Sequence, residues 1–572
     1  MIFQNILRNL LITKIKTGVG FKIVRILLIA PLNEYNYKPH TYYRFPLGIA
    51  YISSALKQAG YDVVCIDCHR VNNLRQTIFE LSKKQKIDLA CLGGMSLMFR
   101  QIKDAIMDIR NVLGNIKIVL GGSIVTTEPE VVLNALNVDI GVLGEGEDSI
   151  VEIAKTLCVG GDLNKVCGLV LRNHETGHIE FTPKRNVIID IDGISMPDYE
   201  GFDLNAYFQQ IPPQTKEIVG DPSEFRPISI SGARSCPYQC TFCYHFPDHP
   251  YRQRSLDNIF IEVDYLINNY NVNYIRFHDE VFCHPGNLER LIEFCERVKQ
   301  RNIKWKMSLR VDVITEAAAI AMRDAGCVEV LLGIENINPL ILKSMKKNIT
   351  KEQIDNACAI LYKNHIATDG YLLFGDVEET KEIVNENLVW WLANAKYKIG
   401  LGLIAILPNS QLYLQAKKEG KIPDIIEYLN SIDITSTHIN MTQMTDESRK
   451  RSNERIFHLL RINGLYGGHI DSARLLGHDG FGRASYYLKA FCPHCGRHPE
   501  YNSLIFSSEN QGIYADCGYT SIRCSLCNRI FDIPNIDIPD KYSGTSTWLS
   551  FTHMAYDNVI KFYNENKRCT YA

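Results

Sequence analysis

Short β-rich segments alternate with helical segments along most of this 572-residue chain, and this alternation constrains the fold more than any other feature. In the first third, the expected strands are Val24–Ala30, Tyr61–Asp67, Ile87–Gly93, Lys117–Gly121 and Asp139–Leu143. The expected helices are Pro46–Gly60, Val71–Lys84, Phe99–Leu113 and Asp148–Leu157. Such alternation predicts a parallel sheet with helices on both faces. We therefore expect a Rossmann-like, doubly wound α/β domain here.

A second alternation follows a proline-rich, polar connection that contains Pro212, Pro213 and Pro222. Its expected strands are Ile228–Gly232, Tyr274–His278, Lys304–Val311, Val328–Ile334, Thr368–Gly375 and Gly400–Leu407. Its expected helices are Leu256–Asn269, Asn287–Arg301, Glu316–Ala325, Lys351–Asn364, Thr380–Ala395 and a last one after Ser410. Six strand–helix units predict a partial (β/α)6 barrel, in which functional groups lie at the carboxyl ends of the strands.

Composition excludes several classes of protein. A hydrophobic share of 46% argues against disorder, and a net charge of −2 argues against a surface coated for nucleic acid. Without a run of about 18 apolar residues, no membrane-spanning helix is expected. We expect a cytoplasmic protein. The 18 cysteines are not needed as disulfides in a chain of this length, so they are either core residues or metal ligands.

Three cysteines follow the first expected barrel strand with the spacing C-x3-C-x2-C: Cys236, Cys240 and Cys243. Three thiolates cannot complete a tetrahedral zinc site, but they can hold three irons of a 4Fe-4S cluster and leave the fourth iron open. The alternative is three buried thiols at a strand end. The spacing favours the cluster.

This motif, with Phe242 directly before its last cysteine, resembles that of the radical SAM superfamily. The resemblance implies a 4Fe-4S cluster and S-adenosylmethionine (SAM), which is cleaved to a 5′-deoxyadenosyl radical that abstracts hydrogen from an unactivated carbon. It also implies a small-molecule substrate and a low-potential electron donor such as flavodoxin or ferredoxin. Phe242 and Tyr244 are then expected at the SAM site, with Tyr244 near the adenine.

Polar residues or glycine stand at the carboxyl ends of the other expected barrel strands: Asp279, Glu280, Arg310, Glu335 and Gly375. By the same resemblance, Asp279 or Glu280 would hold the amino group of SAM and Arg310 would face its carboxylate. Glu335 would approach the ribose, and Gly375 would also contact SAM. For each charged residue, the alternative is a salt bridge at the barrel end.

Two further elements bear on this likeness. Gly375 opens the sequence GDVEET, which matches a family element, although Glu379 and Thr380 are equally well explained as helix-start residues. After the sixth strand, this chain has Leu407-Pro408-Asn409-Ser410 where relatives commonly show P-x-P-G-T. That departure affects what the resemblance can imply about the residues that contact the substrate.

Glycines and acidic residues mark the carboxyl ends of the strands in the first domain, where ligands of doubly wound sheets bind. They are Gly93, Gly94, Gly121, Gly122, Gly144, Glu145, Gly146 and Glu147. The segments PLGIAYISSAL, GGSIVTTEPE and GEGEDSI together resemble the cobalamin-binding domain that precedes the barrel in one class of radical SAM enzymes. The resemblance covers roughly residues 22–155 and implies cobalamin at these positions.

The first domain departs from cobalamin proteins that ligate cobalt through D-x-H-x-x-G. Asp67-Cys68-His69 looks like the start of that loop, but it follows the second strand and position 72 is Asn. We interpret Asp67 as a strand-end residue and do not expect His69 to bind cobalt. A domain without cofactor is the alternative.

The tail contains a second metal motif, formed by Cys492, Cys495, Cys524 and Cys527 as two C-x2-C pairs. Two such turns make a closed four-sulfur site, which predicts a zinc-ribbon-like domain with zinc. A second iron–sulfur cluster is the alternative, and His494 is expected to be a turn residue. Of the other cysteines, Cys283 near the barrel strand end is a candidate active-site thiol.

The expected organisation has six parts. These are a leader helix 1–21, the cobalamin-binding-like domain 22–190, a linker 191–222, the barrel 223–420, a helix-and-loop extension 421–488 and the ribbon 489–572. Within the extension, His469 and His478 are expected in loops.

Three functions are open at this point. The first is cobalamin-dependent methylation of an unactivated carbon in a small molecule or natural product, with a second SAM restoring methylcobalamin. The second is a radical cyclisation or rearrangement, with or without cobalamin. The third, an RNA-modifying or RNA-binding factor that uses the ribbon, has little support because the ribbon contains few basic residues, among them Lys489, Arg497 and Arg523.

Overall fold

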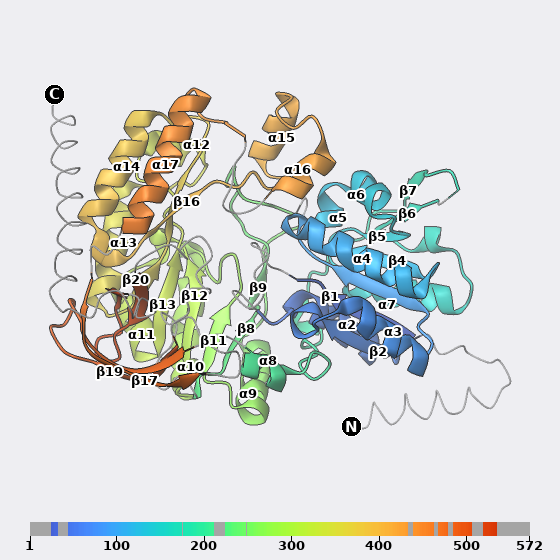
Figure 1. Cartoon of the computed structure of the whole chain (residues 1–572), viewed down its shortest axis with the longest axis horizontal. Helices are drawn as coiled ribbons and strands as arrows, with labels where there is room; N and C mark the ends of the chain where they lie inside the picture. The colour runs from blue at the N-terminus through green and yellow to red at the C-terminus, as the bar shows by residue number, and fades with distance from the viewer. Residues whose placement is uncertain are drawn as a thin grey trace. The chain divides into compact units, whose positions relative to one another are not determined.

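The computed structural model describes residues 25–32, 44–173, 175–210, 224–246, 249–432, 439–462, 467–478, 484–505 and 519–534. The expected leader helix 1–21 and the end of the expected ribbon lie outside these residues. The chain divides into two compact units (Figure 1). One unit is built mainly from Pro46–Asp203 and the other mainly from Leu204–Asp424 and Ser431–Ala572.

The first unit is a seven-stranded sheet with the order β2-β1-β3-β4-β5-β6-β7. Its strands are β1 Arg25–Ala30, β2 Asp62–Asp67, β3 Leu89–Gly93, β4 Lys117–Gly121, β5 Ile140–Val142, β6 Leu169–Arg172 and β7 Ile179–Phe181. The first five are parallel, as expected. Strands β6 and β7 continue the sheet in antiparallel orientation. They were not expected because they are short and β7 is largely exposed, so neither shows a long apolar run.

Alternating residues of β1 explain why helices cover both faces of this sheet. Leu27 and Ile29 belong to one fully buried cluster, whereas Ile26 and Leu28 belong to another on the opposite face. Helices α3 Leu74–Lys84, α4 Phe99–Leu113, α5 Ser123–Thr127 and α6 Pro129–Leu136 contribute to the first cluster. Helices α2 Leu47–Gln58 and α7 Glu147–Cys158 contribute to the second. The doubly wound fold is confirmed.

The second unit contains a curved parallel sheet in which sequential strands are neighbours (Figure 1). Its strands are β8 Pro227–Ile230, β11 Tyr274–Phe277, β12 Lys304–Leu309, β13 Cys327–Leu332 and β14 Ala367–Asp369. Strands β15 Tyr371–Phe374 and β16 Gly400–Leu403 form a further parallel pair, joined to the rest through a bridge between Glu335 and Leu372. This is the partial barrel that the sequence predicts.

One expected strand is divided in the structure. The segment Thr368–Gly375 breaks at Gly370, so that β14 pairs with β13 while β15 pairs with β16. A Cβ atom at position 370 would lie 2.8 Å from the Leu332 carbonyl oxygen, so only glycine permits this close approach. The break turns the chain from one sheet into the other.

Helices surround the barrel strands. They are α8 Leu204–Gln210, α9 Leu256–Tyr270, α10 Leu288–Lys299, α11 Glu316–Asp324, α12 Pro339–Ser344, α13 Lys351–Lys363, α14 Lys381–Ala393, α15 Gln411–Lys418 and α17 Asp446–Ile462. Helix α16 spans Ile425–Ser431. Trp305 of β12 packs edge-to-face on Phe294 of α10, at a centroid distance of 5.1 Å. Because Trp305 faces the helices, its neighbour Lys306 faces the barrel interior.

The tail forms two small antiparallel sheets. One contains β17 His469–His478, β18 Ala484–Phe491 and β19 Glu500–Ile505, and the other is the hairpin of β20 Tyr519–Arg523 and β21 Ile530–Pro534. The expectation of loops around His469 and His478 was wrong, because both lie on β17. That strand is largely exposed and its register shifts twice against β18, so its sequence lacks a clear alternation.

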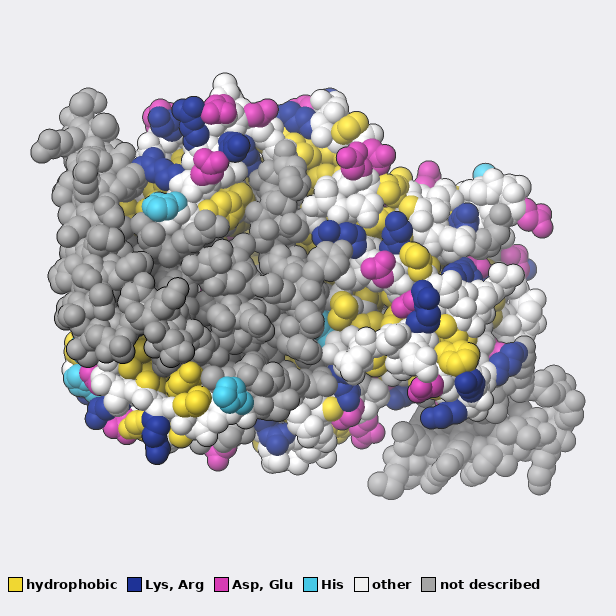
Figure 2. Space-filling view, in the orientation of Figure 1, with side chains coloured by type: hydrophobic (Ala, Val, Ile, Leu, Met, Phe, Trp, Pro, Cys, Tyr) yellow, Lys and Arg dark blue, Asp and Glu magenta, His cyan; other side chains and the backbone are white. Residues whose placement is uncertain are grey.

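The described surface has no single dominant charge. On the face seen in Figure 2, basic and acidic side chains are interspersed, in keeping with the net charge of −2. Among the described residues, no helix is long and apolar enough to span a bilayer.

Candidate active site and metal centre

The cysteine loop, Cys236–Cys243, begins directly after β8 and the short strand β9, Ala233–Arg234. Ser235 has a φ of 63°, a left-handed conformation that turns the chain into the loop. Cys240 is buried, and Cys236 and Cys243 are half-buried. Burial raises the pKa of Cys236 to about 11 and that of Cys243 to about 12. These thiols therefore hold their protons at neutral pH until a metal replaces them.

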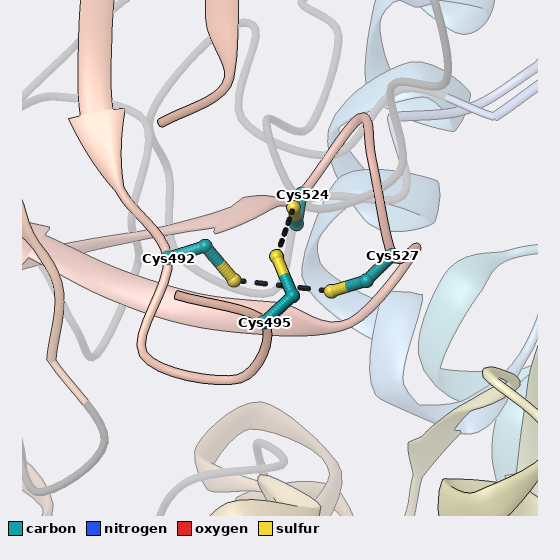
Figure 3. A group of neighbouring side chains, drawn as sticks. All are labelled: Cys492, Cys495, Cys524 and Cys527. Atoms are coloured by element: carbon teal, nitrogen blue, oxygen red, sulfur yellow. Dashed lines mark hydrogen bonds between the residues drawn. The ribbon is translucent and has the colours of Figure 1, made fainter. Parts of the chain in front are cut away.

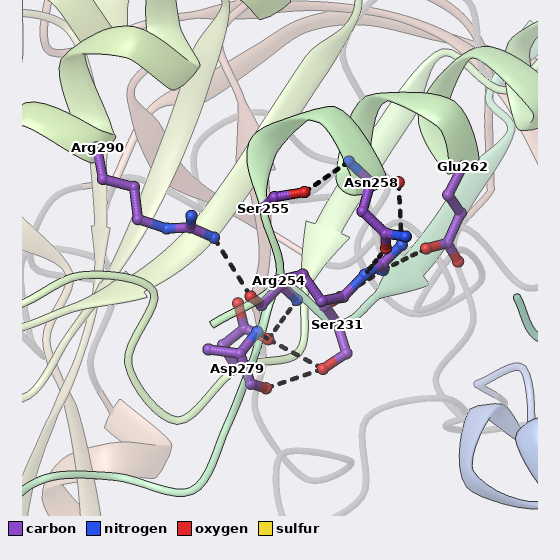
Figure 4. A network of polar contacts seen from close by, with 9 residues as sticks. Ser231, Arg254, Ser255, Asn258, Glu262, Asp279 and Arg290 are labelled. Atoms are coloured by element: carbon purple, nitrogen blue, oxygen red, sulfur yellow. Dashed lines mark hydrogen bonds and ion pairs between the residues drawn. The ribbon is translucent and has the colours of Figure 1, made fainter. Parts of the chain in front are cut away.

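Asp279 fixes the strand end that precedes the cysteine loop (Figure 4). Its Oδ1 atom accepts hydrogen bonds from the Gly232 N–H at 2.8 Å, the Ala233 N–H at 3.0 Å and the Ser231 hydroxyl at 3.2 Å. Arg290 donates to the Gly232 carbonyl at 3.3 Å. The carboxyl is fully enclosed, and burial raises its pKa to about 7. Oδ1 of Asp279 is thus engaged by the strand end, whereas its Oδ2 is buried and has no hydrogen-bond partner among the described residues.

A buried arginine just before helix α9 supports the same turn. Arg254 donates to the Ser231 carbonyl at 2.7 Å and to the Asn258 side chain at 2.6 Å, and it forms an ion pair with Glu262 (Figure 4). Arg254 and Glu262 are both buried. The polar network therefore holds the end of β8 from two sides.

Glu280 differs from its neighbour Asp279 because its side chain is exposed. Surrounding protein nevertheless raises the pKa of its carboxyl by desolvation. Its charge also raises the pKa of Cys243 and Tyr244, after the larger effect of burial on each. Of the two acids that the sequence could not separate, Glu280 is the one that faces the cysteine loop and stays open to a ligand.

Glu335 and Arg310 are linked by a lysine that sequence reasoning missed. Lys347 is buried, its ammonium lies 2.8 Å from a Glu335 carboxylate oxygen, and its carbonyl accepts a hydrogen bond from Arg310 at 3.0 Å. Arg310 also pairs with Asp312 at 2.9 Å, and its guanidinium lies 3.8 Å from the ring centre of Tyr238 in the cysteine loop. Glu335 has a φ of 63°, an uncommon conformation that occurs at functional sites. No sequence pattern marks Lys347, because it lies in an irregular connection between α12 and α13.

Two aromatic residues of the motif lie beside the cysteines. Phe242 is half-buried, and Tyr244 packs edge-to-face on Phe246 at a centroid distance of 4.9 Å. The Tyr244 hydroxyl and the Thr241 hydroxyl are buried and have no hydrogen-bond partner among the described residues. Buried polar groups are normally paired, so these two atoms indicate a site for a polar ligand.

Gly375 follows β15 in a conformation that only glycine adopts readily, with a φ of 120°. Its N–H donates to both carboxylate oxygens of Glu379, at 3.0 and 3.1 Å. Glu379 is buried, which raises its pKa to about 7. Thr380 caps α14 by accepting from the Ile383 N–H at 3.4 Å. Thr380 is therefore the helix-start residue, whereas Glu379 turns back to the strand end.

In the first unit, the predicted glycines meet at the carboxyl edge of neighbouring strands. Gly93 and Gly121 are register partners on β3 and β4, and the Gly94 N–H donates to the Gly121 carbonyl at 3.2 Å. Gly122 has a φ of 89°, and a Cβ atom there would clash with the backbone of Gly94. All four glycines are partly exposed, so this edge presents bare backbone.

The third glycine segment follows β5. Gly144 has a φ of 72° and its N–H donates to Thr126 Oγ1 at 3.0 Å. Glu145 accepts from the Ile188 N–H at 3.3 Å, and Gly146 precedes the first residue of α7, the buried Glu147. This segment lies beside the other two because β4 and β5 are adjacent.

The Asp67-Cys68-His69 segment has a local structural role. Asp67 is the last residue of β2, and its Oδ1 atom accepts from the His69 N–H at 3.0 Å and lies 3.3 Å from His69 Nδ1. The interpretation of Asp67 as a strand-end residue is confirmed.

The four cysteines of the tail form a compact group (Figure 3). Their sulfur atoms all lie within 4.8 Å of one another, with Cys492 and Cys527 at 3.8 Å and Cys495 and Cys524 at 3.9 Å. Hydrogen bonds from the neighbouring thiols lower the pKa of Cys524. Four converging thiols with one easily ionised member are suited to bind a metal ion.

His494 is a turn residue, as expected. Its Nε2 atom lies 2.8 Å from the Ile530 carbonyl oxygen, and its Nδ1 atom lies 3.1 Å from the Tyr362 hydroxyl. Burial lowers its pKa to about 4, so the ring is neutral. Both ring nitrogens have partners in the protein.

The structure does not support the expectation that Cys283 is an active-site thiol. It is completely buried, and burial raises its pKa to about 12. A thiol that is neither accessible nor ionised packs as a small apolar side chain.

Three described basic residues of the ribbon have partners within the protein. Arg523 is buried in an ion pair with Glu329, and Lys489 lies 3.1 Å from Glu500. Arg497 approaches the Leu526 carbonyl at 3.4 Å. These contacts further weaken the case for a nucleic-acid surface on this domain.

Comparison with known proteins agrees with both halves of this site. Residues 41–154 match the family model of the B12 binding domain, and residues 230–386 match that of the radical SAM superfamily. The chain is 29% identical over 373 residues to an uncharacterized methyltransferase of Pyrococcus horikoshii, covering 64% of this chain and 77% of the relative. It is 27% identical over 352 residues to an anaerobic magnesium-protoporphyrin IX monomethyl ester cyclase of Rubrivivax gelatinosus, with 60% of each chain covered.

Two solved structures share the fold. The radical SAM methyltransferase TsrM of Kitasatospora setae, solved with cobalamin and a 4Fe-4S cluster, superposes with a TM-score of 0.57 at 18% identity, covering 70% of this chain and 75% of that chain. The cobalamin-dependent SAM radical enzyme OxsB superposes with a TM-score of 0.54 at 18% identity, covering 86% and 66%.

The fold and the two sites define a radical SAM enzyme with an amino-terminal B12-binding domain. The chain thus contains a B12-binding domain and a radical SAM domain, which imply cobalamin on the doubly wound domain and a 4Fe-4S cluster with SAM in the barrel.

The residues present fit these cofactors. Cys236 and Cys243 are partly accessible and Cys240 is buried, and among the described residues only the tail cysteines form a compact group suited to a single ion. Thiolates that bind separate irons of one cluster must lie farther apart than ligands of a single ion. The unpartnered Tyr244 hydroxyl and the open Glu280 carboxylate suit a polar ligand such as SAM.

Proposed function

We propose that this protein is a cobalamin-dependent radical SAM methyltransferase that acts on an unactivated carbon of a small molecule. The observation that carries the proposal is the pairing of two sites in one chain. One is the Cys236–Cys243 loop at the barrel strand ends, and the other is the bare glycine edge of a B12-binding domain. The Pyrococcus horikoshii relative is likewise named a methyltransferase.

In this proposal, Cys236, Cys240 and Cys243 hold the cluster through three irons. Glu280 accepts hydrogen bonds from the amino group of SAM, since Asp279 is occupied by the Gly232 and Ala233 backbone. When bound, the cluster with SAM supplies hydrogen-atom abstraction and cobalamin supplies a methyl group.

Other residues position these ligands. The Lys347 ammonium orients Glu335 toward the ribose, and Arg310, stacked on Tyr238, keeps the cysteine loop in place and faces the carboxylate of SAM. Gly375 brings bare backbone to the same edge. Tyr244 offers its unpartnered hydroxyl near the adenine, beside the half-buried Phe242.

On the first unit, we propose that cobalamin lies over the edge formed by Gly93, Gly94, Gly121 and Gly122, where side chains would prevent close approach. The segment from Gly144 to Glu147 would border the same ligand. Because a radical SAM enzyme needs a reductant, we further propose a low-potential donor such as flavodoxin or ferredoxin. The cytoplasmic location and the six-part domain division stay predictions.

The test uses full-length protein purified and reconstituted without oxygen, then supplied with cobalamin, a reductant and SAM whose methyl group is deuterated. We expect one cobalamin per chain and transfer of the label to the released corrinoid, measured by mass spectrometry. Absence of both cobalamin binding and label transfer would contradict the methyltransferase.

A second candidate is a radical cyclisation, favoured by the likeness to the Rubrivivax gelatinosus cyclase. It predicts formation of 5′-deoxyadenosine from SAM without movement of the deuterated methyl group. The same reaction mixture therefore separates the two functions.

A further inference from the structure

The first cysteine pair of the ribbon lies in a tight turn, the first knuckle, Cys492–Arg497. The Cys492 N–H donates to the Arg497 carbonyl at 2.9 Å, and the Gly496 N–H donates to the Cys492 carbonyl at 2.9 Å. Gly496 has a φ of 67° and a Cβ atom there would meet no other atom within 4 Å. This turn directs its two thiols inward and leaves its left-handed residue in open space.

The second knuckle, Cys524–Arg529, repeats this backbone. The Cys524 N–H donates to the Arg529 carbonyl at 2.8 Å, and the Asn528 N–H donates to the Cys524 carbonyl at 2.8 Å. Asn528 is left-handed like Gly496, with a φ of 60°. Two matching turns that face each other place two pairs of sulfurs around one point.

The distances between these sulfurs decide how many metal atoms the site can hold. A zinc ion bound at about 2.3 Å by four thiolates in a tetrahedron separates the sulfurs by about 3.8 Å. The separations of 3.8 Å for Cys492–Cys527 and 3.9 Å for Cys495–Cys524 are close to that value. All four sulfurs also lie within 4.8 Å of one another, whereas thiolates that bind separate irons of a cluster lie farther apart. The geometry therefore favours one ion over a second iron–sulfur cluster.

The first knuckle contacts the barrel through His494 and the Tyr362 hydroxyl, whereas the second knuckle makes several contacts with backbone carbonyls of the barrel. The Asn528 side-chain amide donates to the Val328 carbonyl at 3.1 Å and to the His365 carbonyl at 2.9 Å. Arg529 donates to the Tyr362 carbonyl at 2.9 Å, and its guanidinium lies 3.9 Å from the Tyr362 ring centre. These contacts lie near the amino-terminal ends of β13 and β14, which we call the barrel floor. The floor is the end opposite the Cys236–Cys243 loop.

Arg523, next to the first cysteine of the second knuckle, enters this floor. Its guanidinium lies 2.5 Å from a carboxylate oxygen of Glu329, and it also donates to the Val328 carbonyl at 2.9 Å. Glu329 faces the barrel interior beside its register partner Lys306, whose ammonium lies 2.8 Å away. Arg523, Glu329 and Lys306 are all at most 5% exposed. Buried charges of this kind require an ordered partner.

We propose that Cys492, Cys495, Cys524 and Cys527 bind one zinc ion, and that this ion orders the second knuckle so that Arg523 and Asn528 close the barrel floor. The metal holds Cys524 and Cys527 in place, and these cysteines bracket the turn between Arg523 and Asn528. Zinc binding and the stability of the barrel are therefore coupled.

The metal content is tested on the full chain with the substitutions Cys236→Ala, Cys240→Ala and Cys243→Ala, so that no barrel cluster contributes. We expect one zinc per chain and no acid-labile sulfide. After zinc is exchanged for cobalt(II), we expect the absorbance of a tetrahedral thiolate complex, and Cys524→Ser should abolish it. Sulfide with several irons per chain would overturn the single-ion site, and one iron without sulfide would overturn zinc.

The coupling is tested with two matched substitutions in the otherwise unchanged protein. Asn528→Gly keeps the left-handed turn but removes both contacts to the floor, whereas Gly496→Asn changes the equivalent residue in open space. We expect both variants to bind one zinc per chain. Only Asn528→Gly should lower the melting temperature.

Combining changes gives the decisive comparison. Cys524→Ser should lower the melting temperature through loss of zinc, and adding Asn528→Gly should lower it by much less than it does in the zinc-bound protein. Fully additive effects, or a melting temperature unaffected by Asn528→Gly, would overturn the coupling.

Discussion

The protein contains two sets of cysteines that differ in spacing along the chain and in geometry. The four tail thiols lie within 4.8 Å of one another and could hold one metal ion, whereas among the described residues the Cys236–Cys243 loop forms no such group. Burial raises the pKa of Cys236 and Cys243, while hydrogen bonds among the tail thiols lower the pKa of Cys524 and raise that of Cys492. The difference teaches that the number of metal atoms, one or several, is encoded in how the backbone turns and not in the number of cysteines.

The two sets are also held in place differently. The tail thiols lie in two matching turns of local hydrogen bonds. The barrel loop is fixed instead by distant groups, namely Asp279 at its start and Arg310 with Lys347 at its centre. The tail can therefore build its site by itself, whereas the barrel loop depends on the whole barrel.

The largest effect should come from removing the barrel set. Changing Cys236, Cys240 and Cys243 together to alanine should abolish the absorbance of the iron–sulfur cluster and the cleavage of SAM, because no thiolates remain to bind iron. The tail metal should stay at its full content. Both are measured by metal and sulfide analysis and by 5′-deoxyadenosine formation. If iron and sulfide remained after the triple change, the cluster would not be bound by the barrel set, and its assignment there would be wrong.

The next largest effect should come from Arg523→Met, which removes a buried partner of Glu329. We expect a loss of about 3 kcal/mol in the free energy of unfolding, at the low end for breaking a buried ion pair because Lys306 remains beside Glu329. Urea unfolding measures it.

Lys489→Met is the matched control, since it removes the exposed pair with Glu500 on the same domain. We expect a much smaller change in the free energy of unfolding there, because solvent screens an exposed ion pair. Equal effects of the two substitutions would contradict the view that the tail is fastened through Arg523.

The smallest effect should be a change in pH dependence on replacing Asp279 by asparagine. Burial raises the pKa of Asp279 to about 7, above its value near 4 in the unfolded chain. Between these values the folded state binds more protons, so this residue makes the protein more stable as the pH falls from about 7 toward 4. The Asp279→Asn variant keeps an oxygen that accepts from the Gly232 and Ala233 N–H groups, but it cannot be protonated and so lacks the increase in stability at lower pH.

The measurement compares urea unfolding of both proteins at pH 5 and pH 8. The wild type should gain stability relative to Asp279→Asn at the lower pH, by up to about 1 kcal/mol per pH unit. A difference that is constant with pH would show that Asp279 is ionised in the folded state and that the strand end before the cysteine loop is held by a charge.

The sequence by itself determined the two α/β units, the barrel strand order and the positions of both cysteine motifs. Strand–helix alternation and ligand spacing are local patterns, and they predicted most elements within a few residues, such as α4 at Phe99–Leu113. The sequence did not reveal β7 or β17, because their exposed residues show no clear alternation of apolar and polar residues.

Only the tertiary structure decided how the neighbours Asp279 and Glu280 divide their roles, since the partners of Asp279 lie 46 to 48 residues away. It likewise brought the four tail sulfurs within 4.8 Å of one another and Arg523 to Glu329, 194 residues earlier. Hydrogen bonds and buried ion pairs join residues that the fold brings together, and no local pattern records such pairs. Local periodicity therefore gave the architecture, whereas long-range packing set the chemistry of each site.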